Sequence, residues 1–275
     1  MKLGLDAGGT ATRWVLADGD RIVARGTVAG FSGHLFERSA VARLTTLLGT
    51  LAATLPARPH AITAGVTGLT AGAPAADQVQ ALLAAAFDLP PPAIEVVNDL
   101  VIAHRAAFPP GHGIVLLAGT GSIAAHVDAA GTLISAGGRG ALIDDAGSAY
   151  WIAITALRRV LRQEDVTPGS GFATPLGASL AATIGGSDWH TIRARIYGAD
   201  RGSIAELARA VVDADDIFDA AAAELLRLTT ALRHRIGDQP IVATGGAFAL
   251  TPRLGASIAP IPVRDLDAAA AAAAR

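Results

Sequence analysis

Two glycine-rich turns, each placed after an apolar stretch, are the first candidates for chemistry in this sequence. "DAGGT" occupies residues 6–10 and "GTGS" occupies residues 119–122. Glycine has no Cβ, so backbone N–H groups in such turns can approach phosphate oxygens closely and form a concave anion site. The hydroxyls of Thr10 and Thr120 would add two donors. These turns predict polyphosphate binding, although each could also be an ordinary hairpin turn.

Two carboxylates stand near the ends of predicted strands. Asp6 would repel phosphate, so it is better suited to hold Mg²⁺, through water, because Mg²⁺ keeps several waters and needs few carboxylates. Asp99 follows the strand "AIEVVN" and precedes a helix. There it could accept the proton of an attacking hydroxyl, or it could only cap the helix.

A third glycine turn, "ATGGAF" at residues 243–248, follows a late apolar strand. Gly245 and Gly246 could let the backbone lie flat against a nucleotide base, or they could form a plain strand-to-helix turn. None of the three turns is a P-loop, because the pattern GxxxxGK[ST] does not occur.

The elements that must position these residues follow from periodicity. In the first part of the chain we expect strands at 2–6, 12–18, 21–27, 60–68 and 93–98, and helices at 33–55, 75–87 and 100–107. "DAGGT" is then the turn between the first two strands. His104 and Arg105, about one turn after Asp99, are expected to face solvent. The Pro-Pro at 109–110 and Gly111 suggest a domain boundary.

The pattern then starts again. Strands are expected at 113–118, 122–128 and 132–136, with helices at 145–163, 171–183, 188–197, 203–213 and 217–236. Two short strands follow at 240–246 and 258–263, and the final helix is expected near Asp265. At an offset of 111 residues, Gly8 corresponds to Gly119 and Thr10 to Gly121. Such a repeat predicts duplicated α/β domains that face each other across a cleft.

Composition limits the function classes. The 275 residues are 51% hydrophobic, carry a net charge of −2 and include no cysteine. A disulfide framework, a cysteine nucleophile and a cluster held by thiolates of this chain are excluded. No basic run suggests a nucleic-acid partner. Neither a signal peptide nor an apolar span of about 18 residues is apparent, so we expect a soluble cytoplasmic protein without membrane contact.

Five segments in order resemble the N-acetylglucosamine kinase / BadF-type ATPase family of the actin–hexokinase–Hsp70 superfamily. They are "DAGGT", "VVNDL", "LLAGTGSIA", "GGRGALIDDAGSAYWIA" and "ATGGAF". The resemblance implies two actin-like (ribonuclease H-like) domains, at residues 1–109 and 110–264, with ATP in the cleft. It also implies that the final helix, residues 265–275, packs on the N-terminal domain, and it allows a homodimer.

The resemblance also implies roles for single residues. Asp99 would be the catalytic base towards a sugar hydroxyl, and Asp6 would organise Mg²⁺. Backbone and hydroxyl groups would contact ATP at Gly8, Gly9, Thr10, Thr120, Gly121, Gly245 and Gly246. The sugar would be contacted by Ser122, Gly138 and Asp145, with His34 as a further candidate that could equally only begin a helix.

Departures from the family pattern lie on the sugar side. The tryptophan of the family's GGWG is Arg139 here, and its GDEG reads Asp144-Asp145-Ala146-Gly147. Arg139 could favour an acidic group on the substrate, or it could simply pair with Asp144 or Asp145. The expected function is therefore an ATP-dependent kinase of an amino sugar or related monosaccharide, such as glucosamine or N-acetylglucosamine. The alternative is a BadF-type ATPase or an ATP-binding regulator without a sugar substrate.

Overall fold

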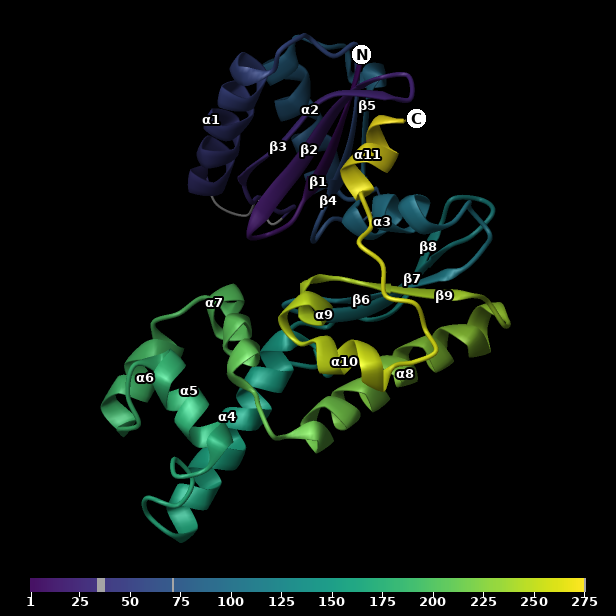
Figure 1. The fold of residues 1–275 in the computed structure, drawn as a ribbon. Helices are drawn as coiled ribbons and strands as arrows, with labels where there is room; N and C mark the ends of the chain where they lie inside the picture. The colour runs from purple at the N-terminus through teal and green to yellow at the C-terminus, as the bar shows by residue number, and fades with distance from the viewer. Residues whose placement is uncertain (34–37, 71, 275) are drawn as a thin grey trace. The chain divides into compact units, whose positions relative to one another are not determined.

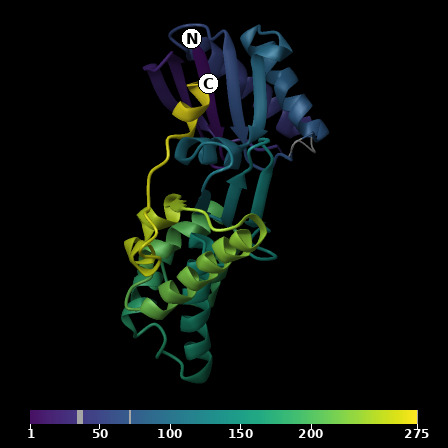
Figure 2. The same ribbon diagram turned by 90° about the vertical axis from the view of Figure 1, so that its right-hand side faces the viewer.

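A computed structural model describes residues 1–33, 38–70 and 72–274. The chain forms two compact units. The first comprises residues 1–111, 127–133 and 266–275, and the second comprises residues 112–126 and 134–265. Each unit is built on one sheet (Figures 1 and 2).

The first sheet has five strands in the order β3-β2-β1-β4-β5. The strands are β1 (Lys2–Ala7), β2 (Ala11–Asp18), β3 (Arg21–Ala29), β4 (Ala61–Val66) and β5 (Ile94–Asn98). β1 pairs antiparallel with β2 and parallel with β4, and β4 pairs parallel with β5. The carboxyl ends of β1, β4 and β5 therefore lie at one edge of the sheet, where Asp6 and Asp99 are found.

Helices cover both faces of this sheet (Figure 1). Helices α1 (Arg38–Thr54) and α2 (Pro74–Phe87) bury Leu44, Leu48 and Leu83 against Leu3 and Leu5 of β1. The opposite face carries α3 (Asp99–Ala107) and the C-terminal helix α11 (Ala268–Ala273). The alternation of β1 residues between the two faces explains why both can be apolar.

The C-terminal helix packs directly on the first strand. A Cβ at Gly4 would collide with the backbone of Ala269 and lie 2.6 Å from the amide nitrogen of Ala273. Gly4 therefore lets an alanine helix approach the sheet closely. The helix begins later than expected, because Asp267 rather than Asp265 caps it by accepting the Ala270 N–H.

The second sheet repeats the first in the order β8-β7-β6-β9. Its strands are β6 (Ile114–Ala118), β7 (Ser122–Val127), β8 (Leu133–Gly137) and β9 (Ile241–Thr244). β6 pairs antiparallel with β7 and parallel with β9, as β1 does with β2 and β4. The predicted strand at 258–263 is reduced to one parallel bridge, from Val263 to Ala243, in the position that β5 occupies in the first sheet.

The remaining helices belong to the second unit. They are α4 (Ala149–Val166), α5 (Pro175–Ile184), α6 (Trp189–Tyr197), α7 (Arg201–Ala205), α8 (Asp215–Ile236), α9 (Gly246–Leu250) and α10 (Pro252–Ser257), with 3₁₀ turns at Pro91–Ala93 in the first unit and Glu206–Ala210 in the second. The predicted helix at 203–213 is thus broken into α7 and a 3₁₀ turn. The largest apolar cluster joins α4, α5 and α8 to β6. Among the described residues, no helix combines the length and apolarity that crossing a membrane requires.

Candidate functional site

The first glycine turn is a tight connection between β1 and β2. The Gly8 N–H donates to the Ala11 carbonyl at 3.0 Å. On one side Gly30 supports the turn, since a Cβ at Gly30 would lie 2.5 Å from the carbonyl oxygens of Gly8 and Gly9. On the other side Gly9 is exposed, with nothing within 4 Å of where its Cβ would be. The turn therefore offers backbone that an anion can approach.

Asp6 and Asp99 are brought together across a glycine. Strand register places Asp6 beside Gly65 of β4, and a Cβ at Gly65 would lie 3.2 Å from the Cα of Asp99. Because position 65 lacks a side chain, helix α3 starts close to the sheet. The first-turn carboxylate of α3 therefore lies near the carboxylate at the end of β1.

This environment raises the pKa of Asp99 to about 6, from an ordinary value of 3.8. Burial is the largest cause, because it disfavours the charged form, and the negative charge of Asp6 adds to it. Hydrogen bonds from the Thr67 hydroxyl and the Leu100 N–H oppose the shift. A carboxylate with this pKa is ionised at neutral pH and is still a stronger base than an ordinary aspartate.

The capping interpretation of Asp99 is wrong in this structure. The N-cap of α3 is Asn98, whose side-chain oxygen accepts the Leu100 N–H at 2.9 Å and whose amide donates to the Leu69 carbonyl at 2.7 Å. Asp99 is the first residue of the helix, and its own oxygen also accepts from Leu100 at 3.0 Å. Its carboxylate is thus positioned by a helix that a neighbour already caps.

Arg13, which lies outside the sequence motifs, forms an ion pair with Asp6. Its guanidinium donates twice to Asp6 Oδ2, at 2.5 and 3.0 Å. The signal was present in the sequence, because Asp6 and Arg13 flank the turn symmetrically and pair across β1 and β2. Within the described part of the chain, no hydrogen bond is found to the other oxygen, Oδ1.

The donor chemistry near Asp6 fits a magnesium ion. Asp6 lies beside a glycine turn that is predicted to bind phosphate, and Mg²⁺ is commonly bound by one or two carboxylates together with substrate phosphates and water. A cage of three or more His, Cys, Asp or Glu side chains is not found among the described residues. The site therefore suits an ion that arrives with phosphate.

The remaining expectations for the first unit concern His34, His104 and Arg105. His34 lies outside the described residues, so its predicted contact with the sugar stays a prediction. The expectation that His104 and Arg105 face solvent is wrong: His104 is fully buried and Arg105 pairs with Glu95 at 2.9 Å. Helix α11 packs against Ile102 and Ala103 of α3, so α3 is more buried than a lone amphipathic helix would be.

The second glycine turn is tied to the substrate segment of the resemblance, residues 137–153. Ser122 is buried and its hydroxyl donates to the Ala146 carbonyl at 2.7 Å, while its carbonyl accepts the Gly138 N–H at 2.9 Å. The Gly119 carbonyl accepts the Ala149 N–H at 2.9 Å. Ser122 and Gly138, both predicted to contact sugar, therefore lie together.

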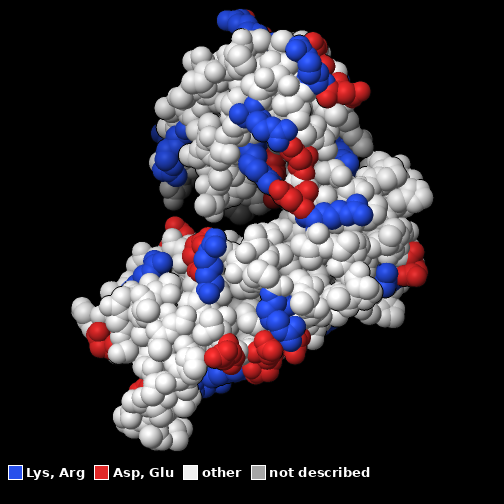
Figure 3. Space-filling model, viewed as in Figure 1, with Lys and Arg blue, Asp and Glu red and all other residues white. Residues whose placement is uncertain are grey.

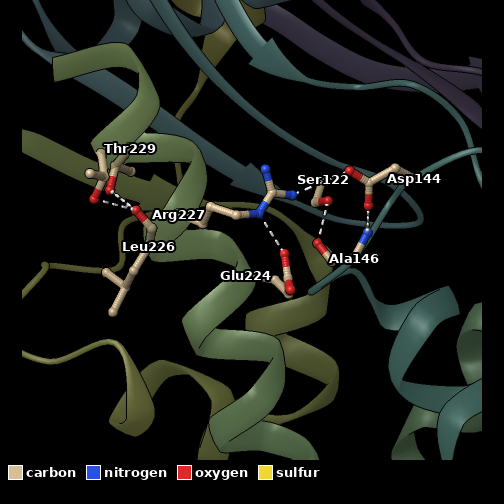
Figure 4. A network of polar contacts seen from close by, with 8 residues as sticks. Ser122, Asp144, Ala146, Glu224, Leu226, Arg227 and Thr229 are labelled. Carbon is tan, nitrogen blue, oxygen red and sulfur yellow. Dashed lines mark hydrogen bonds and ion pairs between the residues drawn. The ribbon is translucent and has the colours of Figure 1, made fainter. Parts of the chain in front are cut away.

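The two carboxylates of this segment have separate partners. Asp145 binds Arg201 at 2.6 Å, and Asp144 binds Arg227 of α8 at 3.2 Å. Figure 4 shows Arg227 extending from α8 between Glu224 and Asp144, beside the Ser122–Ala146 hydrogen bond. The alternative that Arg139 pairs with Asp144 or Asp145 is therefore wrong.

Arg139 itself is exposed. Its neighbours Gly138 and Gly140 both have positive φ, +67° and +86°, so the backbone bends on either side of it. Of the ion pairs found among the described residues, none includes Arg139. Its guanidinium is therefore available to a ligand.

The third glycine turn lies beside the second. Gly245 has φ of +116°, and a Cβ there would collide with the carbonyl of Ala118, the residue before Gly119. Gly246 begins α9, and nothing lies within 4 Å of where its Cβ would be. Close pairing of β6 with β9 thus brings two predicted ATP-binding segments of the second unit together.

The structure groups the predicted residues into two sets. Asp6, the first turn and Asp99 share one edge of the first sheet; Thr120–Ser122, Gly138–Arg139, Asp145 and Gly245–Gly246 surround the ends of β6, β7 and β9. A pocket of about 230 Å³ lies elsewhere, between α4 and α6, and is lined by residues such as Tyr150, Arg158 and Trp189. None of the predicted site residues lines it.

Known proteins give the fold and the family. A solved candidate N-acetylglucosamine kinase from Chromobacterium violaceum is 22% identical with a TM-score of 0.75, over 98% of this chain and 96% of the other. A second one, from Porphyromonas gingivalis, is 19% identical with a TM-score of 0.72 and the same coverage. A ROK-family glucokinase from Streptomyces griseus, solved with glucose and AMPPNP, is 15% identical with a TM-score of 0.55, over 99% and 97%. The fold is thus the two-domain ATPase fold of these proteins.

A curated relative matches over a shorter stretch. Over 72 residues the chain is 39% identical to an N-acetylmuramic acid/N-acetylglucosamine kinase from Clostridium acetobutylicum. That match covers 26% of this chain and 24% of the relative. The sequence profile of the BadF/BadG/BcrA/BcrD ATPase family, by contrast, matches residues 3–259, so the chain belongs to this family.

Proposed function

We propose that this protein is an ATP-dependent kinase that phosphorylates a hydroxyl of an amino sugar or a related monosaccharide. The observation that carries the proposal is Asp99, a carboxylate at the start of α3 with its pKa raised to about 6 and with Asp6 and a phosphate-type turn beside it. An enzyme that only hydrolyses ATP has less need of a base poised in this way. The likeness to solved sugar kinases supports the same reaction class.

In this mechanism Asp99 accepts the proton of the attacking sugar hydroxyl. General bases work best when their pKa lies near the working pH, which a value of about 6 satisfies. The glycine turns bind phosphate oxygens through backbone N–H groups, and Thr10 and Thr120 add hydroxyls. When held by Asp6, Mg²⁺ would neutralise charge on the phosphates. Ser122, Gly138, Arg139 and Asp145 orient the acceptor.

A screen of acceptors tests the reaction class. ADP formation is measured with hexoses, hexosamines, N-acetylhexosamines and acidic sugars, each against a reaction without sugar. A kinase forms ADP faster with its acceptor, because water is a poor substitute for the bound hydroxyl. Equal ADP formation with and without every sugar would favour the ATPase alternative, and no ADP formation at all would favour the regulator.

Asp99→Asn tests the base. The substitution is nearly isosteric and removes the proton acceptor, so we expect kcat to fall about 10²–10⁴-fold while ATP binding is kept. Asp77→Asn is the matched control, because Asp77 is the first-turn acid of the neighbouring helix α2 and is exposed. Near-normal turnover of Asp99→Asn would leave Asp99 without a catalytic role.

The melting temperature separates lost catalysis from lost fold. Because the pKa of Asp99 is raised in the folded protein, its ionised form destabilises the fold once the pH rises through about 6. Asparagine stays neutral, so Asp99→Asn should melt at or above the wild-type temperature at pH 8. At pH 4 this difference should shrink.

A further inference from the structure

Arg201 lies outside every sequence motif, yet it contacts Asp145 in the segment of residues 137–153. It is the first residue of α7, and its Nη2 donates to Asp145 Oδ2 at 2.6 Å. The Asp145 side chain is only 4% exposed, whereas that of Arg201 is 52% exposed. The arginine therefore reaches from the surface to a carboxylate that solvent barely touches.

Asp145 connects the two loops expected to bind substrates. Its Oδ1 accepts the N–H of Gly140 at 3.0 Å. On the other side, a Cβ at Gly121 would lie 2.9 Å from Oδ2, so the carboxylate packs directly on the second glycine turn. The loop that carries Gly138 and Arg139 is thereby held against the turn that carries Thr120.

Arg201 supplies the opposite charge for this buried carboxylate. A buried carboxylate is costly unless an opposite charge and hydrogen bonds compensate it. Among the described residues, Arg201 is the one cation that pairs with Asp145. Without it the carboxylate would turn outward towards water, and this change would weaken its bond to the Gly140 N–H.

Two contacts hold the backbone of helix α7, which carries Arg201. Asp200 caps α7 by accepting the Ser203 N–H at 2.7 Å, and Arg195 of α6 donates to the Ser203 carbonyl at 3.3 Å. These bonds hold the backbone of α7, from which the Arg201 side chain extends to Asp145. This gives helices outside the motifs a direct connection to the acceptor-binding loop.

We propose that Arg201 is a positioning residue that sets acceptor affinity by holding Asp145, and through it the Gly138–Gly140 loop, in the binding conformation. The inference rests on the proposed kinase function. It predicts that loss of Arg201 weakens binding of the sugar, which the loop contacts, far more than binding of ATP.

The first test compares kinetic constants of Arg201→Gln and Arg201→Lys. The KM for the acceptor should rise about tenfold or more in Arg201→Gln, with the KM for ATP within about twofold, because one charge-assisted hydrogen bond is lost. Lysine keeps the charge and should recover part of the affinity. Arg209→Gln is the matched control, since it removes a 2.9 Å ion pair, Arg209–Glu206, nearby in the chain. Equal increases in both KM values, with a lower melting temperature, would overturn the proposal.

A double variant tests whether Arg201 acts through Asp145. In Asp145→Asn the buried group is neutral and no longer needs a cation. Adding Arg201→Gln to it should therefore raise the acceptor KM by less than about twofold. A further tenfold rise in the double variant would mean that Arg201 acts by another route.

Hydrogen exchange gives a readout that needs no substrate. Arg201→Gln should speed the exchange of backbone amides in residues 138–147, Gly140 above all, while amides of β1 and β4 stay as in the wild type. Unchanged exchange at Gly140 would refute the clamp even if the protein is a kinase. If instead the kinase proposal fails in the acceptor screen, faster exchange at Gly140 would still establish the clamp.

Discussion

Asp6 and Asp99 form a carboxylate pair whose charges affect each other. Removing the negative charge of Asp6 removes one of the two causes that raise the pKa of Asp99. In Asp6→Asn the pKa of Asp99 should therefore fall from about 6 towards 3.8, although burial keeps it above that value. Since Asp99 must be ionised to act as a base, the acid limb of kcat/KM against pH should move to lower pH.

The midpoint of this pH profile is the measurement, because the maximal rate will also fall if Asp6 holds Mg²⁺. Asp18→Asn is the control: Asp18 lies at the end of β2, is exposed and has a distant partner, Arg21, at 3.8 Å. Its acid limb should match the wild type. An acid limb that stays in place in Asp6→Asn would mean that the limb reports a group other than Asp99.

Arg139 is the residue that tests whether the acceptor carries an acidic group. It is exposed, and the nearby carboxylates Asp145 and Asp144 bind Arg201 and Arg227 instead. If Arg139 recognises an acidic substituent, Arg139→Trp should remove a preference for an acidic over a neutral sugar of about tenfold or more in kcat/KM. The melting temperature should not change, because no ion pair is lost. Equal kcat/KM losses on both sugars would contradict a role in reading charge.

At the scale of elements, the position of Asp99 depends on how closely α3 approaches β4. Gly65 permits this approach, since a Cβ there would collide with the Ile102 side chain and press on the Cα of Asp99. Gly65→Ala should therefore displace the start of α3 and lower kcat roughly tenfold or more, with a loss of about 1–3 kcal/mol in the free energy of unfolding. ATP affinity should change little.

Gly49→Ala is the matched control for this element. Gly49 lies within α1, is exposed and has nothing within 4 Å of where its Cβ would be. Alanine in a helix interior should stabilise the protein by up to about 1 kcal/mol and leave kcat unchanged. Chemical denaturation and steady-state kinetics measure both effects. A Gly65→Ala variant that behaves like Gly49→Ala would show that α3 can adjust without moving its catalytic carboxylate.

At the scale of the whole molecule, one chain builds the same sheet twice. The order β3-β2-β1-β4 of the first sheet returns as β8-β7-β6-β9 in the second. Each hairpin turn at the start of its sheet is a glycine turn, so the duplication repeats the turn that is predicted to bind phosphate. On the face that Figure 3 shows, positive and negative side chains mostly lie near one another, and broad uncharged areas separate these groups. The division of the chain into two actin-like domains at residues 1–109 and 110–264 stays a prediction.

The sequence by itself determined the local elements and the motifs. Apolar alternation predicted strands β1 to β9 to within a few residues, and the offset of 111 residues between the glycine turns predicted the duplication that the two sheets show. The sequence identifies the glycine turns, Asp6 and Asp99 as candidate site residues, because these motifs consist of residues adjacent in the chain. The prediction of a strand at 258–263 is wrong, because the structure has a single bridge there, from Val263 to Ala243.

The tertiary structure alone decided which groups meet. Arg13 faces Asp6 through strand pairing, Asn98 rather than Asp99 caps α3, and Arg201 reaches Asp145 across 56 positions of sequence. His104 is buried, and a helix from the far end of the chain packs on its neighbours Ile102 and Ala103. Apart from the Arg13–Asp6 pair, which the symmetry of the turn indicates, these contacts leave no periodic signal, because they depend on how close two backbones come. That distance is set by packing, at positions such as Gly4 and Gly65 where a missing Cβ lets helix and sheet touch.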